Sequence, residues 1–199
     1  MFILYALVVG LLLGVVTGGS PARLAALRFR WGPAVAAGLL TQVVLFSTPA
    51  GDALGGLAPW VYIASNVLVL AAVARNVAIR GLALVFAGGL SNALAILVND
   101  GYMPVSAAAM AAMGRVERAG YSNSRFLEDV QLAPLTDIFA MPTWLPGANV
   151  FSVGDMLIGI GAAAAIGFAL HRRDLDPPVA ARPTPFVDGA PRPDGASAH

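Results

Sequence analysis

Residues 151–170 read FSVGDMLIGIGAAAAIGFAL, and the only charged residue in this run is Asp155. An α-helix rises 1.5 Å per residue, so about twenty apolar residues can cross the roughly 30 Å hydrocarbon core of a bilayer. The run is continuous rather than alternating, which indicates a helix and not a barrel strand. The stretch therefore predicts a membrane-spanning helix.

Four further stretches have the same character and contain neither Arg nor Lys: residues 2–19, 33–48, 57–74 and 81–98. The whole chain of 199 residues is 58% hydrophobic and 12% charged, with a mean hydropathy of +0.76. A soluble domain carries about 25% charged residues. The composition therefore argues against a soluble enzyme, a nucleic-acid-binding protein and a disordered chain. We expect an all-α fold, an integral membrane helix bundle with five transmembrane helices.

The arginines predict the orientation of this bundle. The links after the first and third stretches and the segment after the fifth carry seven arginines: Arg23, Arg28, Arg30, Arg75, Arg80, Arg172 and Arg173. In a five-helix chain these three regions lie on one side of the membrane. The positive-inside rule then places the N-terminus outside and the C-terminus in the cytoplasm.

Two regions lie outside the predicted helices. Residues 99–150 are too long for a passive turn, and we expect an extracytoplasmic segment with a short helix starting after Ser106. Within it, residues 126–139 are expected to form two short pieces on the membrane surface, interrupted at Pro134. Residues 174–199 contain six prolines and few large apolar side chains, which predicts a disordered cytoplasmic tail.

Several chemistries are excluded by residue type. The chain has no Cys, and its two histidines, His171 and His199, lie outside the predicted spans. We therefore predict no disulfide, no thiol catalysis and no intramembrane histidine metal site. We expect no cofactor, no metal and no nucleic-acid partner; the expected partners are the lipid bilayer and either a second copy of the chain or another membrane protein.

Polar residues within membrane helices usually face the bundle interior. The candidates for ligand binding or for bundle hydrogen bonds are Gln42, Asn66, Asn92 and Asn99. Two interpretations remain open for these amides: they join neighbouring helices, or they line a ligand path.

The catalytic candidates are Asp100, Asp137 and Asp155, which would converge at the outer ends of the fourth and fifth helices. Two neighbouring carboxylates that share a proton can activate water. Asp155 also has a structural interpretation, because Ser152 three residues earlier would complete a capping box.

Glycines 10, 14 and 18 recur every four residues on the first predicted helix. Such a stripe of small residues suits close packing between helices, either within the bundle or between two copies of the chain.

Two local patterns resemble a known family. The stretch NDGYMPV at residues 99–105, together with LTDI at 135–138 and VFSVGD at 150–155, is similar to a bacterial membrane family catalogued as domain of unknown function 5317. The resemblance covers about residues 1–173 and implies a multi-pass fold in the bacterial plasma membrane, without an assigned reaction. Asp100 stands where that family tends to have Gly, which weakens its case as a catalytic partner.

A more distant resemblance is to the lipoprotein signal peptidases, which use two intramembrane aspartates. FSVGD at 151–155 is similar to their second motif, and GGLSN at 88–92 is similar to the start of their first. Ala95 stands where the first motif has its aspartate, so the likeness implies either a non-catalytic relative or rebuilt chemistry.

Three functional hypotheses follow. The first is a non-enzymatic scaffold, accessory or small-ligand-binding membrane protein, because no complete catalytic set is present. The second is an intramembrane aspartyl hydrolase using Asp155 with Asp137 or Asp100. The third is a small transporter component with Asn66, Asn92 and Asp155 along its path.

Overall fold

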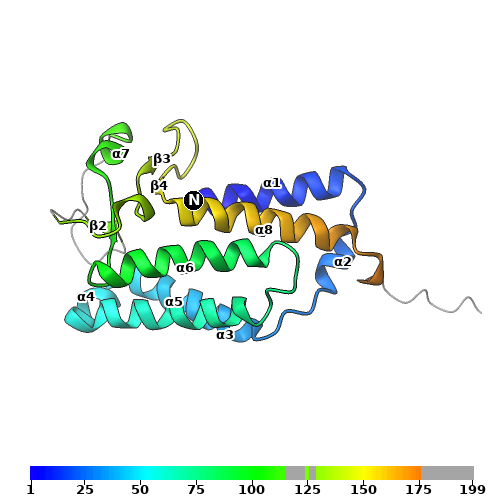
Figure 1. The fold of residues 1–199 in the computed structure, drawn as a ribbon, viewed down its shortest axis with the longest axis horizontal. Coiled ribbons are helices and arrows are strands. Elements are labelled where there is room, and N and C mark those ends of the chain that lie inside the picture. The colour runs from blue at the N-terminus through cyan, green and yellow to red at the C-terminus, as the bar shows by residue number, and fades with distance from the viewer. Residues whose placement is uncertain (115–123, 126–128, 176–199) are drawn as a thin grey trace, which may run out of the picture.

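Five long helices form the body of the protein in the computed structural model, which describes residues 1–114, 124–125 and 129–175 (Figure 1). They are α1 (Phe2–Val16), α3 (Gly32–Ser47), α5 (Ala58–Ala74), α6 (Leu82–Val98) and α8 (Val153–His171). Each predicted apolar stretch therefore contains one helix. The described part of the expected tail is the 3-10 turn η3 (Arg173–Leu175), and residues 176–199 lie outside the described residues.

The helix ends differ little from the sequence prediction, except in the first helix. Pro33 and Pro59 both lie in the first turn of their helices, where the missing N–H costs no hydrogen bond. Helix α1 ends at Val16 instead of reaching residue 19, and Gly18 has a positive φ of 91°. The chain turns there into the short helix α2 (Pro21–Ala25).

The long helices pack in the order α1, α8, α6, α5 and α3, so that α8 lies between α1 and α6, and α5 lies between α6 and α3. Helix α1 starts at the same end as α8 and runs in the same direction, whereas α6 runs against α8 (Figure 1). A short helix α4 (Ala50–Leu54) and a 3-10 turn η1 (Gly55–Leu57) connect α3 to α5.

Glycines allow the close contacts of α8 with both of its neighbours. A Cβ atom added at Gly10 would lie 2.6 Å from the Cα of Ala163, and one added at Gly14 would overlap Leu170. A Cβ at Gly18, in contrast, would meet no atom within 4 Å. Two of the three glycines in the predicted stripe are thus covered by α8 of the same chain, which leaves little of the stripe for contact with a second copy.

The described chain is mostly helical, as the sequence predicts, but the segment between α6 and α8 also contains four two-residue strands. Strand β1 (Met103–Pro104) pairs in parallel with β2 (Ser124–Arg125), and β3 (Phe139–Ala140) pairs antiparallel with β4 (Val150–Phe151). Helix α7 (Ala107–Ala112) starts after Ser106, as expected.

The expected surface pieces at 126–139 fall partly outside the described residues, at 126–128. The remainder contains a 3-10 turn, η2 (Ala133–Leu135), and strand β3.

This segment is fastened to the start of the bundle. The N-terminal ammonium of Met1 donates to Asn149 Oδ1 at 2.6 Å, and the rings of Phe2 and Phe151 stack with centroids 4.5 Å apart. The hydroxyl of Tyr5 donates to the carbonyl of Pro146 at 2.8 Å. The segment between α6 and α8 (residues 99–152), called the outer segment below because it lies at one end of the bundle, therefore fixes the first turns of α1 and α8 relative to each other.

Candidate ligand-binding cavity

A cavity of ≈ 450 Å³ lies among α3, α5, α6 and α8, beneath the outer segment. Most of its wall is apolar, with side chains such as Leu39, Val69 and Ile158. Its polar wall contains six side chains: Gln42, Tyr62, Asn66, Asn92, Asp137 and Asp155. Five of the seven candidate residues from the sequence therefore meet at one place, although they come from four helices and the outer segment.

Asp155 caps the start of α8 and also contacts α6. Its backbone N–H donates to Ser152 Oγ at 3.0 Å, and its Oδ2 accepts from the backbone N–H of Ser152 at 3.3 Å. This reciprocal pair is the capping box that the sequence predicts. The other carboxylate oxygen, Oδ1, accepts a hydrogen bond from Asn92 Nδ2 at 2.8 Å.

Asn92 completes a closed network with these two residues. Its Oδ1 accepts from Ser152 Oγ at 2.8 Å, while its Nδ2 donates to Asp155. The Ser152 hydroxyl, which is 0% exposed, thus donates to Asn92 and accepts from the Asp155 backbone. A rotated Asn92 amide would turn its oxygen toward the carboxylate, so the network fixes the orientation of the amide.

The network depends on the absence of side chains at the contact between α6 and α8. A Cβ atom at Gly154 would overlap Asn92 Oδ1 and lie 2.7 Å from the carbonyl oxygen of Gly88. A Cβ at Gly88 would in turn lie 2.9 Å from the backbone N of Ile158. These glycines bring the two helix backbones close enough for Asn92 to reach the first turn of α8.

Gln42 and Asn66 keep unused hydrogen-bond acceptors. Gln42 Nε2 donates to Ser65 Oγ at 3.2 Å, and Asn66 Nδ2 donates to the carbonyl of Tyr62 at 2.9 Å. Within the described residues, Gln42 Oε1 and Asn66 Oδ1 accept no hydrogen bond. Because both side chains line the cavity, these two oxygens are available to a donor placed inside it.

Two of the candidate amides join neighbouring helices. Gln42 connects α3 to α5, and Asn92 connects α6 to α8. Among the described residues, Asn66 bonds only to the backbone of its own helix.

The other two candidate acids, Asp137 and Asp100, lie in different environments. Asp137 is 6% exposed, and its backbone N–H and C=O pair with Pro104 and Ser106 at 3.0 Å each. Asp100 is exposed, has a φ of +57° and does not line the cavity. The expectation that Asp100 joins the other two acids is therefore wrong, because the left-handed backbone at the end of α6 turns it outward.

Asn99 has a structural role outside the cavity. It is 3% exposed, and its Nδ2 donates to the carbonyls of Ala95 at 2.7 Å and Gln131 at 2.9 Å. Its Oδ1 accepts from the backbone N–H of Gln131 at 2.9 Å. All of its polar atoms are thus engaged in holding the outer segment against α6.

Tyr62 and Ser65 are polar residues of this region that the sequence interpretation did not single out. Tyr62 lines the cavity, and Ser65 is the acceptor for Gln42. With Asn66 they occupy positions i, i+3 and i+4, which share one face of a helix. The spacing of these three residues in the third apolar stretch was the sequence signal that could have identified Tyr62 and Ser65.

The described residues contain no group of three or more His, Cys, Asp and Glu side chains close enough to hold a metal ion. Asp137 and Asp155 are the only acids on the described cavity wall, and the other polar groups there are amides and a phenol. The arrangement is that of a helical bundle enclosing a mixed polar and apolar cavity.

The comparison with known proteins places this bundle in a family. Residues 26–167 match the Family of unknown function (DUF5317), and the chain belongs to this family. No curated protein and no solved structure matches the chain.

Ala95, on which the distant resemblance to the signal peptidases was judged, is part of the core. Ala95 is 0% exposed and packs in a cluster with Leu45, Tyr62 and Ile96. The residue one turn earlier, Asn92, is the one that meets Asp155. Within the described residues, Asp155 therefore meets an amide of α6 and not a second carboxylate.

Proposed function

We propose that the chain is a five-helix integral membrane protein that binds a small ligand in the cavity beneath its outer segment. The observation that carries the proposal is the convergence of Gln42, Asn66, Asn92, Asp137 and Asp155 on one cavity. Its volume falls within the roughly 300–1,000 Å³ of small-molecule sites, and its mostly apolar wall with a few polar groups is typical of them.

The exposed surface of the helices supports the membrane placement. Two helical segments, Ala50–Ala74 and Val153–His171, are long and apolar enough to cross a bilayer, and α1, α3 and α6 are shorter apolar helices. In an apolar 18-residue stretch of each of these two segments, only 28% and 33% of the residues, respectively, are buried inside the protein. The core helix of a soluble protein would be mostly buried. Large side chains such as Leu12, Val16 and Leu40 are more than half exposed, as expected for contact with lipid.

The two ends of the bundle support the proposed orientation. The seven arginines named above lie on the links at one end, whereas among the described residues the other end carries only Arg125. Three exposed tryptophans lie near the helix ends, Trp31 at the arginine-rich end and Trp60 and Trp144 at the other. Tryptophan is enriched at both membrane interfaces, and arginine on the cytoplasmic side. We therefore propose an extracytoplasmic N-terminus and a cytoplasmic C-terminus.

The polar wall indicates the chemistry of the ligand. No Arg, Lys or His is among the described lining residues, and Gln42 and Asn66 each present an unused carboxamide oxygen beside their remaining N–H. The carboxylates of Asp137 and Asp155 are the acidic groups among the described lining residues, and they disfavour an anionic ligand. The proposed ligand is a small amphipathic molecule with a hydrogen-bond-donating amine or hydroxyl at one end and an apolar body.

Thermal unfolding of the purified protein with three probes of equal chain length tests this proposal. Hexylamine and hexanol should raise Tm, while hexanoate should not, because binding to the native state alone stabilises it. Replacing Gln42 and Asn66 together by Leu should remove the response. Thr41→Val is the matched control, because Thr41 is a polar residue of α3 that bonds only to the carbonyl of Ala37. An equal response to hexanoate, or an unchanged response in the double variant, would refute the proposal.

An intramembrane aspartyl hydrolase is the second candidate, because Asp137 and Asp155 line the same cavity. Against it, Asp155 already accepts hydrogen bonds at both oxygens. Cleavage of a lipoprotein signal peptide by wild type, with loss of cleavage in both Asp137→Asn and Asp155→Asn, would favour the hydrolase. Absence of cleavage together with the probe response above would leave the binding function.

A further inference from the structure

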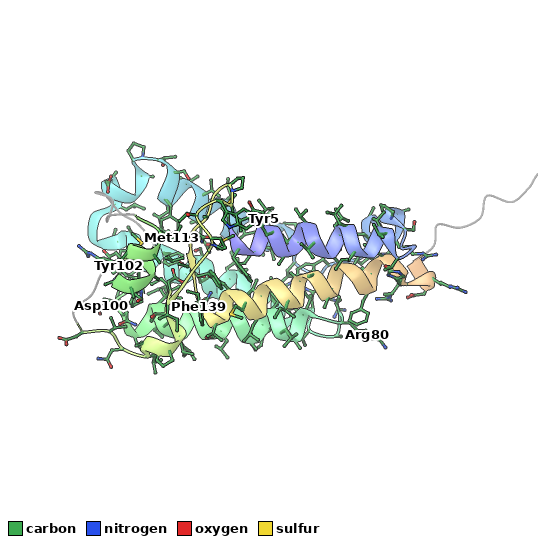
Figure 2. The ribbon with its side chains drawn as sticks, turned by 90° about the horizontal axis from the view of Figure 1, so that it is seen from above. Tyr5, Arg80, Asp100, Tyr102, Met113 and Phe139 are labelled. Atoms are coloured by element: carbon green, nitrogen blue, oxygen red, sulfur yellow. The ribbon has the colours of Figure 1, made fainter. Side chains whose placement is uncertain are left out.

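A second cavity, of ≈ 430 Å³, lies at the opposite end of the bundle, between the link that precedes α6 and the end of α8. Arg80 and Arg172 contribute its cationic groups, and Leu27, Ile79 and Phe168 contribute apolar side chains. Figure 2 shows Arg80 at the end of the bundle away from Asp100 and Tyr102. The cavity is thus separate from the one described above and shares no lining residue with it.

Arg80 is held in place without a carboxylate. Its guanidinium carbon lies 5.4 Å from the centre of the Phe168 ring, in a cation–π contact. Within the part of the chain that the structure describes, Arg80 forms no ion pair. Its charge is therefore uncompensated, while the ring restricts where the guanidinium lies.

Arg172 differs because it pairs with Asp174. Its Nε donates to Asp174 Oδ1 at 3.1 Å, and its Nη2 contacts Oδ2 of the same carboxylate. The guanidinium lowers the pKa of Asp174, so this acid stays ionised and neutralises part of the charge at neutral pH. Arg80 is consequently the arginine of this cavity whose charge no described carboxylate compensates.

The negative end of the α8 dipole is screened from the cavity. The carbonyl of Leu170 accepts from the backbone N–H of Ser20 at 2.8 Å and from Arg23 Nη1 at 3.3 Å. His171 Nδ1 lies 2.8 Å from the carbonyl oxygen of Gly167, and its Nε2 lies 3.2 Å from the carbonyl oxygen of Thr17. The carbonyls that would repel an anion are therefore largely satisfied by protein groups.

We propose that this cavity binds the phosphate diester of an anionic phospholipid, with Arg80 on the phosphate and the lipid chain along Leu27, Ile79 and Phe168. A phosphate is the group that a guanidinium recognises best, and the apolar side chains beside it favour a lipid over free phosphate. Basic pockets between membrane helices on the cytoplasmic side bind anionic headgroups in this way. The inference rests on the membrane placement proposed above, and it is independent of the ligand of the first cavity.

The test uses the full chain in nanodiscs of phosphatidylcholine, with or without phosphatidylglycerol. Native mass spectrometry and thermal unfolding measure lipid retention and stabilisation. Wild type should retain phosphatidylglycerol preferentially, and Arg80→Gln should lower that preference about five-fold, as expected for one arginine at a membrane surface. Asp174→Asn should raise it, because Arg172 is then released.

Arg75→Gln is the matched control. Arg75 lies at the same end and contacts the ring of Trp31 at 4.9 Å, but it does not line the cavity. Equal losses in the Arg75 and Arg80 variants would show general surface attraction and overturn the proposal. Equal stabilisation by inorganic phosphate in phosphatidylcholine discs would overturn the lipid assignment.

Alkaline carbonate extraction of membranes separates failure of this inference from failure of the membrane placement. Release of wild type by carbonate would overturn both. Retention in membranes without preference for phosphatidylglycerol would overturn this inference alone.

Discussion

Replacing Asn92 by Leu should destabilise the bundle by more than the same change at Asn66. Asn92 makes two hydrogen bonds of 2.8 Å across the α6–α8 contact, one to Asp155 and one from Ser152. Its loss leaves the fully buried Ser152 hydroxyl without an acceptor and removes one donor from the Asp155 carboxylate. An unsatisfied buried polar group costs about 1–3 kcal/mol, and interhelical hydrogen bonds in membranes average about 0.6 kcal/mol. We expect a loss of about 2–3 kcal/mol.

Asn66 is the internal comparison for this prediction. Its single hydrogen bond, 2.9 Å to the carbonyl of Tyr62, stays within its own helix. The Tyr62 carbonyl also accepts from Ser65 Oγ at 2.7 Å, so it keeps a partner when Asn66 is removed. Asn66→Leu should therefore cost less than about 1 kcal/mol.

The assay is unfolding of the purified protein in mixed micelles with increasing denaturing detergent, read by the free energy of unfolding. Equal losses in the free energy of unfolding for Asn92→Leu and Asn66→Leu would contradict a structural role for Asn92 and a ligand-binding role for Asn66. A loss below about 0.5 kcal/mol for Asn92→Leu would also refute it, since the network would then contribute no more than a surface hydrogen bond.

Three further predictions follow from the same contacts. Asp155→Asn should lower stability by about 1 kcal/mol in the unfolding assay, because its amide cannot accept from both Asn92 and the backbone N–H of Ser152; an unchanged stability would exclude the cap. Gly154→Ala should cost at least about 2 kcal/mol and reduce binding of the probes, because the added methyl group displaces Asn92, and a neutral outcome would contradict the close α6–α8 contact. A single cysteine at residue 100 should react with a membrane-impermeant maleimide from outside, whereas one at residue 173 should react only after permeabilisation. The chain has no cysteine of its own, so the wild type gives no background. The reverse result would overturn the orientation.

The five long helices could be located from the sequence, because each lies within a long apolar run that contains neither Arg nor Lys. It was less able to define their ends. The first helix stops at Val16, not at residue 19, since Gly18 takes a positive φ that an apolar run does not reveal. The two short ladders escaped prediction because two-residue strands have no periodicity to detect.

The residues of the candidate site could be named individually from the sequence, but their arrangement in space could not. Asn99 and Asp100 are neighbours in the sequence, yet one is buried against Ala95 and Gln131 and the other faces outward. The difference arises from the end of α6, where residue 100 adopts the left-handed conformation. A helical projection extended by one residue past the end of its helix therefore gives the wrong face for Asp100.

The polar residues of this bundle fall into two groups, which differ in whether their side-chain hydrogen-bonding atoms have partners within the protein. Asn92, Asn99 and Ser152 use their side-chain donors and acceptors within the protein, so their polarity is accounted for by the fold. Gln42 and Asn66 each keep a carboxamide oxygen without a described partner, on the wall of a cavity that their own helices enclose. Both side chains are half-buried, so their oxygens are reachable from the cavity, and a leucine at either position would avoid the cost of an unpaired acceptor beside an apolar wall. A ligand that donates to these oxygens would offset that cost, whereas a purely structural bundle would have no need of them.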